Sequence, residues 1–251
     1  MAKSAGRTVA LSAARRRMVD YMRLAQSVPQ IFIHRTMSLA DVADARRGSH
    51  PKIGWSACFI KAYALAGQTV PAVRQSFLTF PHPRLFEHET SSATVAVERA
   101  VDGEPVVFGL RISQPERRPL SEIHARLSAA AHDPLETVEA FQRQIRYGRW
   151  PGFLRRMLMW YALNFKGTLR DRHFGTFAVT SVHGSGAELI SPRAPLTTIF
   201  TYGPVSSQGD VTVRLGFDHR VLDGMTAGRV LAEMEQALLG PIRIELAGAA
   251  R

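Results

Sequence analysis

The stretch GFDHRVLDGMTAG, residues 216–228, places a histidine and an aspartate four positions apart at the end of a strand-like run. The preceding residues, VTVRLGF, alternate as in a half-buried strand, and the small-residue segment that follows is typical of a helix. A turn between a strand and a helix can present a side chain to a cleft. Imidazole is the side chain best suited to proton transfer near neutral pH, so His219 is a candidate general base.

The other residues of this turn have structural interpretations. The carboxylate of Asp223 can fix the loop by accepting hydrogen bonds from backbone amides or from a basic residue. Gly224 permits a backbone conformation that a bulkier residue would resist. As a bare spacing the pair is a weak signal, because a solvated histidine and a capping aspartate are the commoner outcome.

The composition indicates a folded protein with a preference for anionic partners. The chain has 251 residues, of which 45% are hydrophobic, and 32 Lys and Arg stand against 21 Asp and Glu, a net charge of +11. Phosphorylated cofactors, nucleic acid, acidic proteins and anionic membranes all fit this charge. No nucleic-acid-binding motif is present, so we expect no nucleic acid partner.

The cysteine content and the apolar runs narrow the class further. Cys58 is the single cysteine, which excludes an intrachain disulfide and an all-cysteine metal site and fits a reducing, cytoplasmic compartment. It lies in an apolar helical run, where a buried small side chain is a better interpretation than a nucleophile. No run of about 18 apolar residues predicts a membrane span, and no metal site is expected.

The periodicities predict an α+β fold in which a mixed β-sheet is covered by helices, a two-layer sandwich. The clearest hairpin joins the runs 91–100 and 104–113 through an Asp-Gly turn. Further strands are predicted at 30–39, 175–182, 196–205 and 210–219, and helices at 11–26, 40–46, 53–69, 120–131, 137–147 and 225–239.

The motif DHRVLDG, followed by a small-residue helix, resembles the active-site motif of the dihydrolipoamide acyltransferases, the second component of the 2-oxo acid dehydrogenase complexes. It is more distantly similar to the His-x-x-x-Asp-Gly motif of chloramphenicol acetyltransferase. Further blocks resemble the same family in the same order, and together they cover most of the chain: ARRRMVDYM, SVPQIFIHRTMSLADVADAR, KIGWSACFIKAYALAGQTVPAVR, RRPLSEIHARLSAAA and GTFAVTSV.

The resemblance implies a chloramphenicol acetyltransferase-like fold and assigns roles to individual residues. His219 matches the general base that deprotonates the attacking group, and Thr180 aligns with the hydroxyl that stabilises the tetrahedral oxyanion. Asp223 matches the residue that holds the loop and pairs with an arginine in relatives. Arg16 or Arg17 is the candidate partner, although a solvated helix face is an equal alternative.

The resemblance also implies partners. Coenzyme A is expected as the acyl-CoA substrate, and a homotrimer, or a multiple of trimers, is expected because His219 and Thr180 of one active site would come from neighbouring subunits. Since the resemblance begins within the first twenty residues, we expect one catalytic domain over 1–251, with 1–10 as a short tail. No lipoyl or subunit-binding domain is expected, so any lipoyl group would act in trans.

Two departures from the family concern the acceptor side and an added segment. After Thr180 the family usually continues with Asn and a Gly-containing loop, whereas here Ser181 and His183 follow and are candidate substrate-binding residues. A surface-loop histidine is the more common interpretation of His183. The segment 149–172 is basic and aromatic, and we interpret its apolar part as an added core or trimer-interface helix. A cover over an acyl channel and membrane-surface contact through 151–170 are alternatives that are not favoured.

The sequence therefore predicts a CoA-dependent acyltransferase that transfers an acyl group to a thiol, hydroxyl or amine acceptor by direct, general-base-assisted attack. A dihydrolipoamide acyltransferase that uses lipoyl groups in trans is the alternative enzyme. A non-catalytic trimeric scaffold is the alternative from another class.

Overall fold

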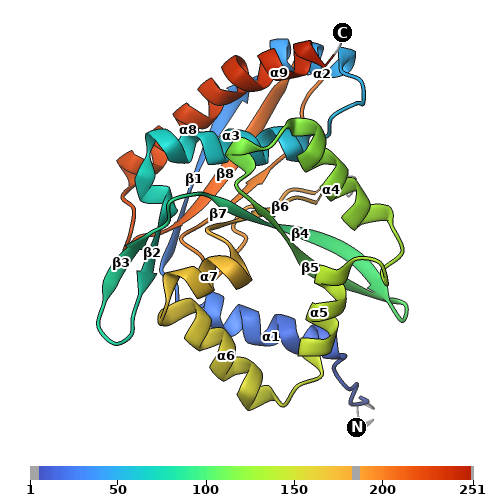
Figure 1. Cartoon of the computed structure of the whole chain (residues 1–251), viewed down its shortest axis with the longest axis vertical. Coiled ribbons are helices and arrows are strands. Elements are labelled where there is room, and N and C mark those ends of the chain that lie inside the picture. The colour runs from blue at the N-terminus through green and yellow to red at the C-terminus, as the bar shows by residue number, and fades with distance from the viewer. Residues whose placement is uncertain (1–5, 183–186, 250–251) are drawn as a thin grey trace, which may run out of the picture.

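A six-stranded mixed sheet forms the centre of the computed structural model, which describes residues 6–182 and 187–249 (Figure 1). The strand order is β1-β8-β7-β6-β4-β5. Strand β6 is parallel to both of its neighbours, β4 and β7. The pairs β4–β5, β7–β8 and β8–β1 are antiparallel. The strand bounds are β1 Gln30–Ser38, β4 Ser92–Val101, β5 Glu104–Ser113, β6 Phe177–Thr180, β7 Thr198–Tyr202 and β8 Asp210–Asp218.

One face of the sheet carries the larger core. Phe177 and Phe200, on neighbouring strands, both pack against Tyr63 of helix α3, with ring centroids 4.5 and 5.0 Å apart. The Tyr63 hydroxyl donates to Oγ1 of Thr198, so its buried polar group is satisfied (2.7 Å). The helices of this layer are α2 Ala40–Gly48, α3 Trp55–Thr69, α4 Leu120–His132, α8 Gly224–Ala237 and α9 Arg243–Gly248, with a π-helical turn at Leu238–Ile242 before α9.

The opposite face of the sheet is covered as well. Ala178 and Ile199 point away from the larger core and form a smaller cluster with Leu163. Figure 1 shows this second group of helices on the other side of the strands from α3 and α8. Its members are α1 Ala13–Ala25, α6 Gly152–Asn164 and α7 Gly167–Phe174. Helix α5, Glu139–Gly148, lies along the edge strand β5, where Gln144 bonds to Gly109 and Phe141 packs on Phe108 in the larger core. The predicted α+β class and helix-covered mixed sheet are confirmed, and the structure adds this second covering layer.

The predicted elements agree with the structure at most positions. The β4–β5 hairpin turns at Asp102 and Gly103, both with positive φ, as an Asp-Gly turn of this kind requires. A short hairpin of β2 Gln75–Leu78 and β3 Arg84–Glu87 was not predicted. Two 3₁₀ turns, Pro71–Arg74 and Pro115–Arg117, complete the element order.

The basic aromatic segment forms two helices where the sequence predicted one. The chain breaks between α6 and α7, and Gly167 begins α7 against the ring of Phe86. A Cβ at that position would lie 2.1 Å from the Phe86 ring, so only glycine allows β3 and α7 to approach this closely. The contact fixes where α7 begins, and α7 leads directly into β6.

A buried ion pair joins the first helix to the first turn of α6. Asp20 accepts from Nε and Nη2 of Arg155, at 2.9 and 2.7 Å, and both side chains are about 95% or more buried (exposed fractions 3% and 5%). Arg155 also donates to the carbonyl oxygens of Gly148 and Trp150. Every strong donor of this guanidinium therefore has a partner, as a buried charge requires.

We expect Asp20→Ala to destabilise the protein by about 3–5 kcal/mol, because it leaves the Arg155 charge buried without its partner. Asp44→Asn is the matched control, since Asp44 forms an exposed ion pair with Arg47 and its loss should change stability by no more than about 1 kcal/mol. Urea unfolding of the two variants measures the difference. Equal effects of both changes would contradict a structural role for the buried pair.

Candidate active site

His219 lies immediately after β8, at the turn that leads into α8, and its side chain is exposed in the single chain. Its backbone amide donates to the carbonyl oxygen of Pro29 (3.1 Å), which ties the turn to the start of β1. The edge of its ring meets Phe217 in a T-shaped contact at 5.8 Å. The turn therefore holds the imidazole at the end of the sheet with one side open to solvent.

A single hydrogen bond sets the chemical character of the His219 ring. Nδ1 lies 2.8 Å from the carbonyl oxygen of Leu222. Because a carbonyl oxygen only accepts, Nδ1 carries the proton and Nε2 of the neutral ring is the basic nitrogen. No residue in the part of the chain that the structure describes is recorded as a hydrogen-bond partner of Nε2. The geometry is that of a general base on an exposed side chain, with one ring nitrogen fixed by the backbone.

The strand end beneath His219 is braced by a second ion pair. Asp218 is fully buried and binds Nε and Nη2 of Arg220 at 2.9 and 2.7 Å. The Arg220 guanidinium stacks over the Phe77 ring, 4.4 Å from its centroid. Arg170 of α7 lies nearby, where burial lowers its pKa to about 10 and the Asp218 charge partly opposes that shift. Both neighbours of His219 in sequence are thereby fixed.

Asp223 is the N-cap of α8. Its Oδ1 accepts from the amide of Thr226 (2.7 Å), and its backbone is extended. Hydrogen bonds from the Thr226 amide and hydroxyl, with a smaller contribution from Arg229, hold the pKa of Asp223 below its usual value. The carboxylate thus joins the His219 turn to the first turn of the helix.

The prediction that Gly224 takes a backbone conformation unfavourable for a bulkier residue was wrong. Gly224 is the first residue of α8, it does not have a positive φ, and a Cβ built on it would meet no atom within 4 Å. Asp223 takes the extended conformation of the cap, so the helix has already begun at Gly224. The position of its absent side chain is open to solvent.

Arg16 and Arg17 do not pair with Asp223 within the chain, which corrects a second prediction. Arg17 donates to the carbonyl oxygen of Val107 on β5 (2.8 Å), and burial lowers its pKa. Strand β5 is at the sheet edge opposite β1, so its outward carbonyls need partners other than a strand. Arg16 lines a pocket between α1 and the turn before α6.

Thr180 ends β6 in a group of hydroxyls. The next residue, Ser181, hydrogen-bonds to Tyr202 at the end of β7, and Ser56 of α3 bonds to the same phenol (2.6 Å). Burial raises the pKa of Tyr202 to about 12, against the opposing effect of these hydrogen bonds. Ser181 is thus already engaged within the chain. His183, the other predicted substrate-binding residue, lies outside the described residues.

The sheet register separates Thr180 from His219. Thr180 pairs with Thr201, and Thr201 pairs with Arg214, which stands five residues before His219 on β8. At about 3.3 Å per residue the two side chains are roughly 16 Å apart along the strands, with one strand between them. One chain therefore does not bring the two predicted catalytic residues together.

Sequence reasoning missed the residues that hold the site. Asp218 and Arg220 flank His219 in the quoted motif. An acidic and a basic residue two positions apart at a strand end could have indicated the ion pair that they form. Arg170 and Tyr202 come from distant parts of the chain, so no local pattern indicated them. Cys58 is buried, which raises its pKa to about 12 and keeps the thiol protonated, in agreement with its exclusion from the site.

No protein-family model matches the chain, and no curated protein matches it. Solved structures do. The cubic core of the pyruvate dehydrogenase multienzyme complex is 14% identical with a TM-score of 0.67, over 96% of this chain and 94% of that one. The dihydrolipoamide acetyltransferase of Azotobacter vinelandii is 15% identical with a TM-score of 0.66, over 96% and 94%. A chloramphenicol acetyltransferase is 11% identical with a TM-score of 0.54, over 88% and 94%. The chain has the fold of these proteins, which confirms the predicted chloramphenicol acetyltransferase-like architecture.

We expect Asp223→Ala to lower the midpoint of thermal unfolding at neutral pH, because the first turn of α8 loses its cap. Asp223→Asn should retain most of the stability, since an amide oxygen also caps. The pKa of Asp223 is lowered in the folded state, so the carboxylate stabilises above its unfolded pKa and this contribution is lost as pH falls through the folded pKa. Scanning calorimetry should show the gap between wild type and Asp223→Ala narrowing below a pH of about 4, by the part that depends on the carboxylate charge. A gap that stays constant down to pH 2 would contradict the charge contribution to the cap, and an unchanged midpoint in Asp223→Ala at neutral pH would contradict the capping role.

Proposed function

We propose that this chain is an acyltransferase that moves an acyl group between coenzyme A and a nucleophilic acceptor, with His219 as the general base. The observation that carries the proposal is the exposed His219 ring, whose Nδ1 donates to the Leu222 carbonyl and so leaves Nε2 as the basic nitrogen. The fold, shared with dihydrolipoamide and chloramphenicol acetyltransferases, supports it. In the Azotobacter protein a serine, a histidine and an asparagine were studied for their catalytic role, and its histidine and asparagine have the four-residue spacing of His219 and Asp223.

The reaction follows from that geometry. Nε2 of His219 takes the proton from the thiol, hydroxyl or amine of the acceptor as this group attacks the carbonyl carbon of the acyl thioester. The carbonyl π electrons move to oxygen, and a hydroxyl donor stabilises the oxyanion. Collapse of the tetrahedral intermediate breaks the bond to sulfur, and the coenzyme A thiolate takes the proton from the imidazolium. Atoms balance without a covalent acyl-enzyme, so both substrates bind together.

The oxyanion donor is proposed to come from a second copy of the chain. Thr180 is the candidate hydroxyl, and within one chain it is roughly 16 Å along the strands from His219. A cyclic homotrimer that brings the Thr180 end of one sheet to the His219 end of the next would complete each site. The similarity to the cubic core of a multienzyme complex supports an oligomer.

Two types of acceptor are compatible with the proposed reaction. A lipoyl group supplied in trans would be the acceptor of a dihydrolipoamide acyltransferase, and a small alcohol or amine would be the acceptor of another type of transferase. Ser181 and His183 remain proposed acceptor-side residues. The net charge of +11 favours the phosphates of coenzyme A.

We expect acceptor-dependent thiol release when the protein is given a panel of acyl-CoA chain lengths with dihydrolipoamide, alcohols or amines. His219→Ala should lower the rate by roughly 10²- to 10⁴-fold, and Thr180→Ala by roughly 10²- to 10³-fold. His34→Ala is the control, because His34 is an exposed histidine on β1 and should keep the wild-type rate.

Two outcomes would overturn the proposal. Undiminished turnover by a folded His219→Ala protein would remove the general base. Absence of thiol release with every pair, from wild-type protein that is folded and oligomeric, would favour a non-catalytic scaffold.

A further inference from the structure

Helix α6 presents an apolar stripe to solvent. Phe153, Met157, Trp160 and Tyr161 stand at spacings of four, three and one residues, so they share one side of the helix. They are exposed by 69%, 54%, 43% and 39%, and Trp150 in the preceding turn by 45%. The inner side of the same helix is buried through Met159, Ala162 and Leu163. The predicted core role therefore accounts for one side of α6 only.

A neighbouring turn extends this aromatic stripe. Phe80, between β2 and β3, stacks on Phe165 at 5.4 Å and meets the edge of Trp160 at 6.1 Å, and it is 45% exposed. Tyr161 stacks on Phe165 at 4.6 Å. The rings are held against one another, so the surface is an ordered patch of aromatic side chains.

The charges around the stripe are of one sign. Arg149, Arg156 and Lys166 are exposed along it, and the helix itself contains no acidic residue. Asp20 is an acid beside it; it is held by Arg155 and lies 3.7 Å from Nη1 of the exposed Arg156. Exposed aromatic residues bordered by arginines are the composition of helices that lie in the plane of a membrane interface.

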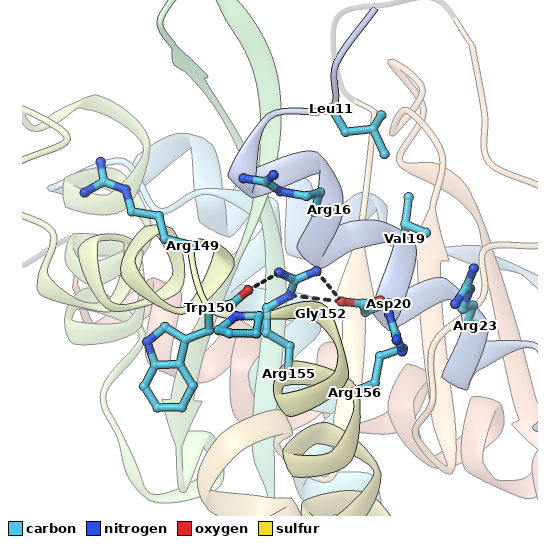
Figure 2. A pocket seen from close by; sticks show the side chains of 11 residues that line it. Leu11, Arg16, Val19, Asp20, Arg23, Arg149, Trp150, Gly152, Arg155 and Arg156 are labelled. Carbon is cyan, nitrogen blue, oxygen red and sulfur yellow. Dashed lines mark hydrogen bonds and ion pairs between the residues drawn. The ribbon is translucent and has the colours of Figure 1, made fainter.

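A basic pocket adjoins the N-terminal end of α6 (Figure 2). It has a volume of about 490 Å³ between α1 and the turn before α6. Arg155 and Asp20 neutralise each other at its floor, as the dashed contacts in Figure 2 show. Four further arginines line the pocket: Arg16, Arg23, Arg149 and Arg156. The apolar part of its wall consists of Leu11, Val19, Trp150 and Pro151.

We propose that this side of the molecule binds to an anionic phospholipid surface. The α6 stripe enters the region between headgroups and acyl chains, and the arginines of the pocket bind lipid phosphates. Charge complementarity selects this occupant over a second copy of the same face, because two arginine-bordered faces would repel each other. No helix in the described part of the chain is long and apolar enough to cross a membrane, so α6 lies on the surface. The proposal does not depend on the proposed enzyme activity.

The two tryptophans of the patch give a direct test on the full-length protein. Trp150 and Trp160 should be quenched by brominated acyl chains in vesicles of phosphatidylcholine with phosphatidylglycerol, and not in phosphatidylcholine alone. Trp55, the third tryptophan, lies on α3 in the other layer, packed beneath Arg46. Trp150→Phe with Trp160→Phe should therefore abolish the quenching while the protein still sediments with the anionic vesicles.

Matched variants separate charge from apolar insertion. Arg149→Gln with Arg156→Gln should lower the vesicle partition coefficient by roughly 25-fold, about fivefold for each basic side chain near an anionic surface. Arg117→Gln with Arg126→Gln removes the same charge from the opposite layer and should change it little. Phe153→Ala should lower partition about tenfold, whereas Ile244→Ala, exposed by 66% against 69% for Phe153, should not.

Three results would overturn the proposal: no quenching in anionic vesicles, equal binding to neutral vesicles, or equal losses from the two arginine pairs. Tryptophan emission that responds to protein concentration and not to vesicles would assign the patch to self-association instead. Circular dichroism of each variant confirms that it is folded. Thiol release measured without lipid tests the enzyme separately.

Discussion

The register of three central strands determines what one copy of this chain can do. Parallel pairing of β6 with β7, and antiparallel pairing of β7 with β8, set Thr180 level with Arg214 and leave His219 at the other end of β8. A shift of one residue would turn Phe177 and Phe200 away from Tyr63, so the buried aromatic packing fixes the register. The separation of the two predicted catalytic residues is thus a consequence of the core.

The turn at the end of β8 is rigid for a reason that is equally local. Asp218 and Arg220 hold the strand end, the Leu222 carbonyl orients the imidazole, and Asp223 caps the following helix. A general base needs a defined tautomer and a defined direction; the Leu222 carbonyl sets the tautomer, and the Phe217 ring packs against the imidazole. The proposed reaction requires that the acceptor group reach Nε2 and that a hydroxyl donor reach the carbonyl oxygen of the thioester.

Much of the fold was predictable because its signals are local. The alternation of apolar and polar residues, the Asp102-Gly103 turn and the small residues after Gly224 are each read from neighbouring positions in the sequence. The strands and helices predicted from them agree with those of the structure at most positions. The break before Gly167 was not predictable, since it depends on Phe86, eighty-one positions earlier. The same holds for Arg17, whose partner on β5 depends on which strand forms the sheet edge. Periodicity showed that α6 is apolar on most sides but not which side the sheet would cover.

The most direct test of a site shared between subunits is complementation in mixed oligomers. His219→Ala and Thr180→Ala chains, each nearly inactive alone, would be unfolded together at equal concentration, refolded, and assayed for acyl-CoA thiol release. In a cyclic trimer, about one site in four would then combine an intact His219 with an intact Thr180 from its neighbour, so activity should recover to roughly a quarter of wild type. Activity that stays at the level of the separate variants, in mixed trimers verified by mass, would contradict a site built from two chains.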